Sequence, residues 1–162
     1  MPVIKDGRLV EDDWTFIPDF LPLDEVARPV VSLARWRDGD CALRARNGRL
    51  GLRLPNDTDP AAIGADLDRF ALIELEFPVF KDGRAYSQAR LLRERHGYRG
   101  ELRAVGDVLV DQLAYMRRCG FDAFEPDQQL DKDDVIAAFE RWPEVYQNAA
   151  DTRTPIWSKR HP

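Results

Sequence analysis

From Leu50 onward, short apolar segments alternate with segments of helical length, and this alternation constrains the fold more than any other feature of the chain. The apolar segments have the length and residue types of strands, and the segments between them place apolar residues at helical spacing. Predicted strands cover 50–55, 71–80, 100–107 and 121–126, and predicted helices cover 60–70, 86–96 and 108–119. Such short alternating units predict an α/β protein built mostly of parallel βα units.

Two architectures satisfy this pattern: an open doubly wound sheet, and a curled sheet that resembles part of a βα barrel. A complete eightfold barrel needs about 250 residues, and the chain has 162. We therefore expect a single domain over residues 1–162. It would consist of a hairpin at 1–17, a βα core at 50–142 and a C-terminal tail at 143–162.

The ends of the chain carry local signals of their own. Asp6-Gly7 lies between two short apolar segments and predicts a tight turn in a small N-terminal β-hairpin. Asp131 has the side chain and the position of an N-cap, and Pro143 stops or kinks the helix that follows. Between these ends, 18–29 is a proline-punctuated connector, 30–33 is a candidate strand, and 37–49 is a loop or a helical turn.

A buried core follows from the apolar positions of these strands and helices. The residues expected in it are Leu72, Ile73, Leu75, Leu109, Leu113, Met116, Val135 and Phe139.

Composition excludes several classes of protein. A net charge of −5 disfavours general binding of nucleic acids, because neutralising phosphates requires a positive field. No apolar run approaches the about 18 residues of a membrane span, and the first residues have no apolar signal core. Cys41 and Cys119 are far apart and form no metal-binding motif, so we expect reduced thiols, a cytoplasmic location and no metal. Phosphate-loop and dinucleotide fingerprints are absent, so no cofactor is expected.

Parallel βα folds bind ligands at the carboxyl ends of their strands. The candidate ligand-binding loops are therefore 77–84, 106–107 and 125–127, and 56–57 is a weaker candidate. Lys81, Arg84 and Ser87 lie where a strand ends and a helix begins, and Asp107 follows the next strand. Cations beside the unpaired amides of a helix start predict an anion-binding site for sulfite, sulfate, phosphate or carboxylate. The alternative is a turn at Asp82-Gly83 in which Arg84 pairs with neighbouring acids.

Asp107 also precedes a helix, and we favour an N-cap role over a catalytic one for its carboxylate.

Charge is segregated along the chain: 84–103 carries net +4 and 122–151 carries net −7. Such segregation can steer a protein partner. The expected partner-binding residues are Arg90, Arg93 and Arg99 or, on the acidic side, Asp131, Asp133 and Asp134. The alternative is a solvated face with internal pairs such as Arg90–Glu94.

Two blocks, DGRAYSQARLLR and DVLVDQLAYMRRCGFDAFE, resemble the bacterial domain-of-unknown-function family 934. Members of that family are commonly labelled as oxidoreductases involved in sulfite reduction, and they carry no assigned catalytic residue. The resemblance implies a place in assimilatory sulfite reduction. Because an oxidoreductase needs a redox centre or cofactor, and the chain has neither a cofactor fingerprint nor a cysteine pair, we expect an accessory protein that docks on sulfite reductase or its electron donor. The alternative is a small cofactor-free enzyme acting on an oxyanion or a phosphorylated metabolite, so the sequence leaves open whether the chain is an enzyme.

Overall fold

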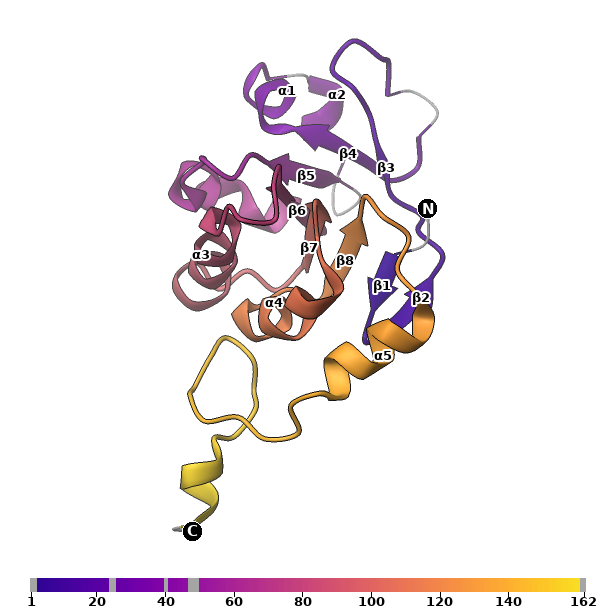
Figure 1. Cartoon of the computed structure of the whole chain (residues 1–162). Helices are drawn as coiled ribbons and strands as arrows, with labels where there is room; N and C mark the ends of the chain where they lie inside the picture. Colours follow the sequence, from indigo (N-terminus) through magenta and orange to yellow (C-terminus); the bar gives the residue numbers. More distant parts are fainter. Residues whose placement is uncertain (1–2, 24–25, 40, 47–49, 161–162) are drawn as a thin grey trace.

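A computed structural model describes residues 3–23, 26–39, 41–46 and 50–160. One eight-stranded sheet runs through it, in the order β2-β1-β8-β7-β6-β5-β4-β3. Strands β3 to β8 are mutually parallel, whereas β1 is antiparallel to both β2 and β8 (Figure 1). The strands are β1 (Val3–Lys5), β2 (Arg8–Val10), β3 (Thr15–Phe16), β4 (Pro29–Ser32), β5 (Gly51–Leu54), β6 (Leu72–Phe77), β7 (Glu101–Gly106) and β8 (Ala123–Pro126).

The parallel strands lie side by side in chain order, so each crossover steps to the adjacent strand in the same direction. Because such crossovers are right-handed, they place their helices on one face of the sheet, and Figure 1 shows the helices around the outside of a curved sheet. The α/β prediction is therefore confirmed, with the sheet in its curled, half-barrel form. The parallel part also includes β3 and β4, which precede the predicted start of the parallel core at Leu50.

The helices of the described chain are short and of several types. They are α1 (Leu33–Arg37), α2 (Cys41–Arg44), the 3-10 helix η1 (Pro60–Arg69), α3 (Arg84–Arg90), the π-helix η2 (Leu91–Arg95), the 3-10 turn η3 (Val110–Gln112), α4 (Leu113–Cys119), α5 (Lys132–Glu140) and the 3-10 turn η4 (Ile156–Arg160). The predicted helix at 86–96 is thus an α-helix continued by a π turn, and the segment after Ser32 forms α1, which the sequence analysis did not predict.

The helix caps and the tight turn act on residues close to them in the chain. Asp59 caps η1 through the Ala61 amide, and Asp131 caps α5 through the amides of Asp133 and Asp134. At the hairpin, Asp6 and Gly7 both have positive φ, 50° and 72°, as a primed two-residue turn requires.

A short link forces the sheet to curl. Strands β2 and β3 are the two edges of the sheet, yet only residues 11–14 join them. The chain from Val10 to Thr15 reaches at most about 18 Å, whereas the edges of a flat eight-stranded sheet would lie about 33 Å apart. The sheet therefore bends until residues 11–14, which we call the strap, can cross its concave face.

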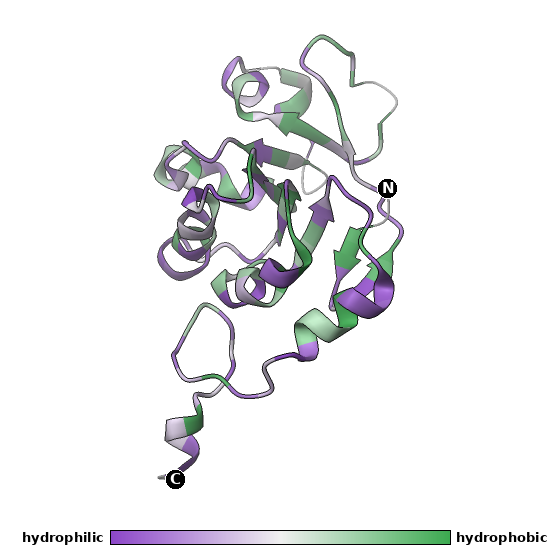
Figure 2. Ribbon diagram, viewed as in Figure 1, coloured by the Kyte–Doolittle hydropathy of each residue, from purple (hydrophilic) through white to green (hydrophobic). Residues whose placement is uncertain are grey.

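Strand residues alternate between two faces of different character. Ile73, Leu75 and Phe77 of β6 join the main apolar core under the helices, while Glu74 and Glu76 face the concave side. The same alternation holds along β7, and Figure 2 shows hydrophobic and hydrophilic residues together along the central strands. Of the eight predicted core residues, seven are buried. Leu109 is only half-buried because the chain turns into η3 there, and Val108 takes the buried position.

Candidate functional site

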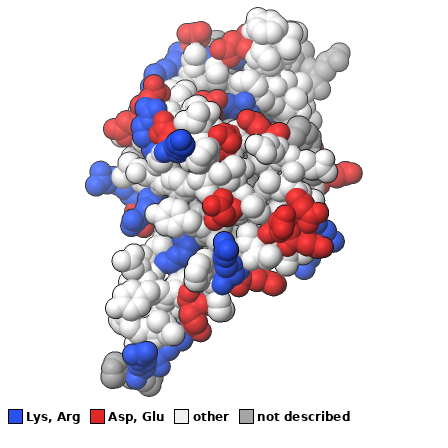
Figure 3. Space-filling view, viewed as in Figure 1, with Lys and Arg blue, Asp and Glu red and all other residues white. Residues whose placement is uncertain are grey.

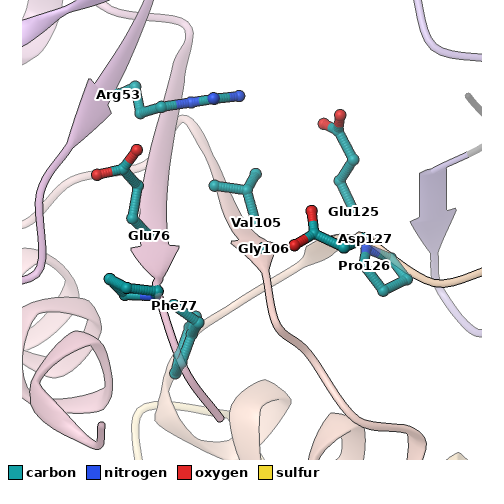
Figure 4. Close-up of a pocket in the computed structure, with 9 residues that line it drawn as sticks. Arg53, Glu76, Phe77, Val105, Gly106, Glu125, Pro126 and Asp127 are labelled. Atoms are coloured by element: carbon teal, nitrogen blue, oxygen red, sulfur yellow. The ribbon is translucent and has the colours of Figure 1, made fainter.

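A cavity of about 540 Å³ opens on the concave face, at the carboxyl ends of β6, β7 and β8. Figure 4 shows Arg53 extending over it from β5, with Glu76 on the same side and Glu125 and Asp127 facing them from the end of β8. The other lining residues are Phe77, Pro78, Val105, Gly106 and Pro126. This is the place where parallel βα folds bind ligands.

The cavity edge depends on a glycine at position 106. Gly106 has φ +100°, and a Cβ there would lie 2.6 Å from the carbonyl oxygen of Phe77. That carbonyl accepts a hydrogen bond of 2.9 Å from the amide of Asp107, which ties the end of β6 to the end of β7. Only glycine combines this backbone angle with such a close approach.

Beneath the cavity lies a buried network of charges centred on Arg103, whose side chain is fully buried. Its guanidinium donates hydrogen bonds to Asp12 at 2.7 Å, Glu125 at 2.8 Å and Glu101 at 2.8 Å. Glu74 lies 3.7 Å away and accepts a 2.6 Å hydrogen bond from Arg53. One guanidinium therefore connects β7 and β8 with the strap.

Burial and pairing shift the pKa values of this network in different directions. Burial raises the pKa of Glu74, and the neighbouring charges of Arg53 and Arg103 offset this only in part. Burial also acts to raise the pKa of Asp12, but the hydrogen bonds and charge of Arg103 outweigh it and hold that pKa below its usual value. The network is thus built around an ionised Asp12–Arg103 pair.

Aromatic rings hold the strap and its continuation in place. The guanidinium of Arg53 lies 3.9 Å from the centroid of the Phe16 ring, and that of Arg28 lies 5.4 Å from the Trp14 ring. Arg28 also pairs with Asp13 at 2.7 Å. Cations over aromatic faces add to the ion pair that anchors Asp12.

The predicted anion-binding residues do not converge on one cavity. Arg84 is engaged by Asp82 through hydrogen bonds of 2.6 to 3.1 Å, the alternative considered from the sequence. Lys81 is exposed and lies 5.6 Å from the Phe80 ring, and Ser87 lines a separate surface hollow beside Arg90 and Glu94. An anion at Arg84 has to compete with a carboxylate that is already bound.

The cap role expected for Asp107 is wrong. The helical segment begins only at Val110, with Leu109 at the N-cap position and no side-chain cap. The Asp107 carboxylate instead accepts a 2.9 Å hydrogen bond from the amide of Phe80. The Asp107 carboxylate therefore fixes the loop after β6. It does not cap the helix, because the backbone turns at Gly106 and the helical segment begins only at Val110.

The three arginines predicted to bind a partner have different surroundings. Arg90 pairs with Glu94 at 3.0 Å, and Arg99 is exposed. Arg93 donates to the carbonyls of Gly120, Tyr98 and Gly100 and pairs with Asp122 at 2.7 Å. Its donors are engaged within the fold, so its main role is to join α3/η2 to the loop before β8. On the acidic side, Figure 3 shows carboxylates gathered near the start of α5, where Asp131, Asp133 and Asp134 are exposed.

A second hollow, of about 360 Å³, lies between α4 and the C-terminal tail, and we call it the aromatic groove. Tyr115 of α4 lines it together with Trp142 and Tyr146, which follow α5, and these side chains are 63%, 63% and 74% exposed. The remaining lining residues are Asp111, Ala114, Arg118, Phe139, Glu144, Val145, Gln147 and Arg153. Large aromatic side chains exposed together in one hollow are typical of a binding surface.

Arginines hold the tail that forms one wall of this groove. Arg118 of α4 pairs with Asp151 and donates to the carbonyl of Gln147. Arg153 donates to the carbonyls of Trp142 and Pro143. The indole of Trp157 donates a 2.8 Å hydrogen bond to the carbonyl of Tyr146. The tail, for which the sequence shows no periodicity, is therefore tied to α4 through Arg118, whose carbonyl also accepts a 3.1 Å hydrogen bond from the amide of Ala150.

Within the described ranges, no group of three or more His, Cys, Asp or Glu residues is placed to hold a metal ion. None of the described helices is both long and apolar enough to cross a membrane.

Sequence reasoning named the loops that surround the strand-end cavity, including Glu125 and Asp127, but missed the charged residues that the strands place in and beneath it. Arg53, Glu74, Glu76 and Arg103 alternate with apolar residues along predicted strands. That alternation was the available signal, because charged residues at every second position of a central strand imply a polar second face. Of the aromatic groove, the sequence analysis noted only the tail, because no pattern relates Tyr115 to Trp142 and Tyr146.

Comparison with known proteins places the chain in a family without assigning it an activity. No curated protein and no solved structure matches it significantly. Residues 51–157 match the bacterial proteins of unknown function DUF934. That region contains β5 to β8, the helices between them, α5 and most of the tail. Because the match covers about two thirds of the 162 residues, the chain belongs to the DUF934 family.

Proposed function

We propose that this protein is a cytoplasmic accessory protein of assimilatory sulfite reduction, and that it acts by docking on sulfite reductase or its electron donor. The pathway rests on the label that members of the family commonly carry, which is an association and not a mechanism. The docking role rests on the aromatic groove, in which three large aromatic side chains are more than half exposed. Tyr and Trp are the residue types that most often dominate binding energies at protein interfaces.

Docking should depend on these aromatic side chains more than on the arginines around Arg90. Charges at the rim of an interface mainly set the association rate and its salt dependence, whereas buried aromatic anchors set the dissociation rate. Arg93 is already engaged by the fold, and Arg90 is already paired.

The test is binding of the immobilised protein to purified sulfite reductase and, separately, to its electron donor at two salt concentrations. A double variant, Trp142→Ala with Tyr146→Ala, should weaken binding by at least about tenfold, as expected for two anchors worth more than 1 kcal/mol each. The matched control is Phe20→Ala, which removes an aromatic side chain that is 84% exposed in the connector between β3 and β4. Binding to neither protein, together with normal growth on sulfate after deletion, would contradict the proposal.

The strand-end cavity favours the alternative of a small cofactor-free enzyme, since it lies where βα barrels carry out catalysis. Its charge argues against an anionic substrate, because Glu76, Glu125 and Asp127 line it and its one arginine, Arg53, is paired with Glu74. Calorimetric titration with sulfite, sulfate and phosphate separates the two functions. Saturable binding of any of these anions would favour the enzyme.

A further inference from the structure

The aromatic groove has two walls of different origin. Asp111, Tyr115 and Arg118 recur every three or four residues, so they form one side of η3 and α4. Trp142, Val145 and Tyr146 form the opposite wall, from the chain that follows α5. A side chain entering between them would meet an aromatic surface on both sides.

The cations that line the groove are engaged elsewhere. Arg118 is paired with Asp151, and its other nitrogen donates to the carbonyl of Gln147. Arg153 donates to two backbone carbonyls, those of Trp142 and Pro143. Both guanidinium groups therefore hold the tail in place, and an anionic ligand would have to displace these contacts.

The two carboxylates that line the groove make fewer contacts than its arginines. Glu144 pairs with Lys159 at 2.7 Å in an exposed ion pair. The side chain of Asp111 is exposed and makes no hydrogen bond or ion pair with any other residue of the described ranges. Asp111 is therefore the carboxylate of the groove that stays available to a ligand, and it lies one helical turn from Tyr115, whereas the side-chain donors of Arg153 are directed at backbone carbonyls.

We propose that the aromatic groove receives an arginine side chain exposed on the partner protein. Aromatic faces carry negative potential and attract cations, and a nearby carboxylate adds a charged hydrogen-bond acceptor. A guanidinium suits both features, because it stacks flat on an aromatic ring while its edge pairs with a carboxylate in two places. This inference rests on the proposed docking function and states the chemistry that the partner must present.

The experiment uses small probes with the full chain, so that it does not depend on which partner is chosen. N-acetyl-arginine amide is titrated while the indole N–H resonances of the tryptophans are followed by NMR. N-acetyl-citrulline amide, which has nearly the same shape without the charge, serves as the matched probe. We expect saturable shifts of the Trp142 resonance with the arginine probe, and binding at least about threefold weaker with the citrulline probe.

Two variants test which residues are responsible. Asp111→Asn keeps the shape and removes the charge, and Tyr115→Ala removes one wall while keeping the Trp142 resonance as the reporter. Each should weaken binding of the arginine probe by about two- to fivefold. Phe20→Ala is the control, because it removes an exposed aromatic side chain that does not line the groove. Equal affinity for the two probes, or unchanged affinity in Asp111→Asn, would overturn the inference.

The outcomes also separate this inference from the proposed function. Arginine-selective binding without binding to either sulfite-reduction protein would leave the groove chemistry standing and remove the proposed pathway. Conversely, reductase or donor binding that Asp111→Asn leaves unchanged would support the docking function and remove arginine recognition.

Discussion

The two faces of the sheet are held by different forces. Under the helices, Ile73, Leu75, Leu102 and Phe124 pack in one apolar core. On the concave face, strands β5 to β8 place charged side chains side by side, and these form ion pairs. The residues are Arg53, Glu74, Arg103 and Glu125. The apolar face tolerates side chains that fit together only approximately, because the hydrophobic effect has no preferred direction. The charged face does not, since a buried charge without its partner is strongly unfavourable.

The largest effect should follow from removing the centre of the charged face. Arg103→Met keeps much of the side-chain volume but leaves Asp12, Glu101 and Glu125 facing one another. We expect the free energy of unfolding to fall by about 3–5 kcal/mol, measured by urea denaturation at pH 7. Leu75→Ala on the apolar face should cost a comparable about 2–5 kcal/mol.

The two variants should differ in their response to pH. The loss in Arg103→Met should shrink in acid as the unpaired carboxylates become protonated, while the loss in Leu75→Ala should not. Arg99→Met, at an exposed position, controls for the loss of an arginine and should stay within about 0.5 kcal/mol of the wild type. A loss below about 1 kcal/mol in Arg103→Met would show that the charged face contributes little.

A smaller effect should come from releasing the strap. Asp12→Asn removes the charge that pairs with Arg103, and we expect a loss of about 1–3 kcal/mol at pH 7. The pKa of Asp12 is lowered in the folded protein, so its stabilisation is present above the unfolded value and is lost as pH falls through the folded one. The gap between wild type and variant should therefore be widest near neutral pH and close below about pH 4.

Urea denaturation at a series of pH values measures this gap. The raised pKa of Glu74 acts in the opposite direction, since its stabilising contribution is lost as pH rises, but it is shared by both proteins. A gap that is constant between pH 7 and pH 3 would mean that Asp12 acts through its shape and not through its charge.

The smallest effect concerns the surface pair of Arg84 and Asp82, which belongs to neither face. Arg84 holds the pKa of Asp82 to about 2 through hydrogen bonds from its side chain and its amide. In Arg84→Ala the pKa should rise toward the ordinary 3.8, as followed by NMR titration of the carboxyl carbon. Stability should stay close to that of the wild type, because exposed ion pairs contribute little. An unchanged pKa would mean that the pair does not persist in solution.

The apolar face was largely predictable from the sequence, and the charged face was not. The core positions in β6 and α4 follow from strand and helix periodicity, and Asp131 and Asp6-Gly7 act on residues close to them in the chain. Asp12 and Arg103, in contrast, are 91 positions apart. Only the curling of the sheet brings them together, and curling depends on how all eight strands pair.

The same reason explains what was missed at the candidate site. The loops around the strand-end cavity follow from the βα pattern, because every parallel strand delivers its carboxyl end to one edge. The aromatic groove requires a tail without periodicity to fold back on α4, and it does so through single contacts such as Arg118–Asp151. Contacts of that kind have no repeating pattern from which they could be recognised.

The position of β1 has a consequence for how the protein is made on the ribosome. Strands β3 to β8 can join the sheet one after another as they are synthesised, since each pairs with the strand made just before it. The hairpin is made first, but its place beside β8 exists only after Pro126 has been added. At usual rates of synthesis this delay is roughly 6–25 s. During that time the nascent chain presents the edge of β1 that β8 later covers, which makes this stage of biosynthesis the one at which a chaperone would matter most.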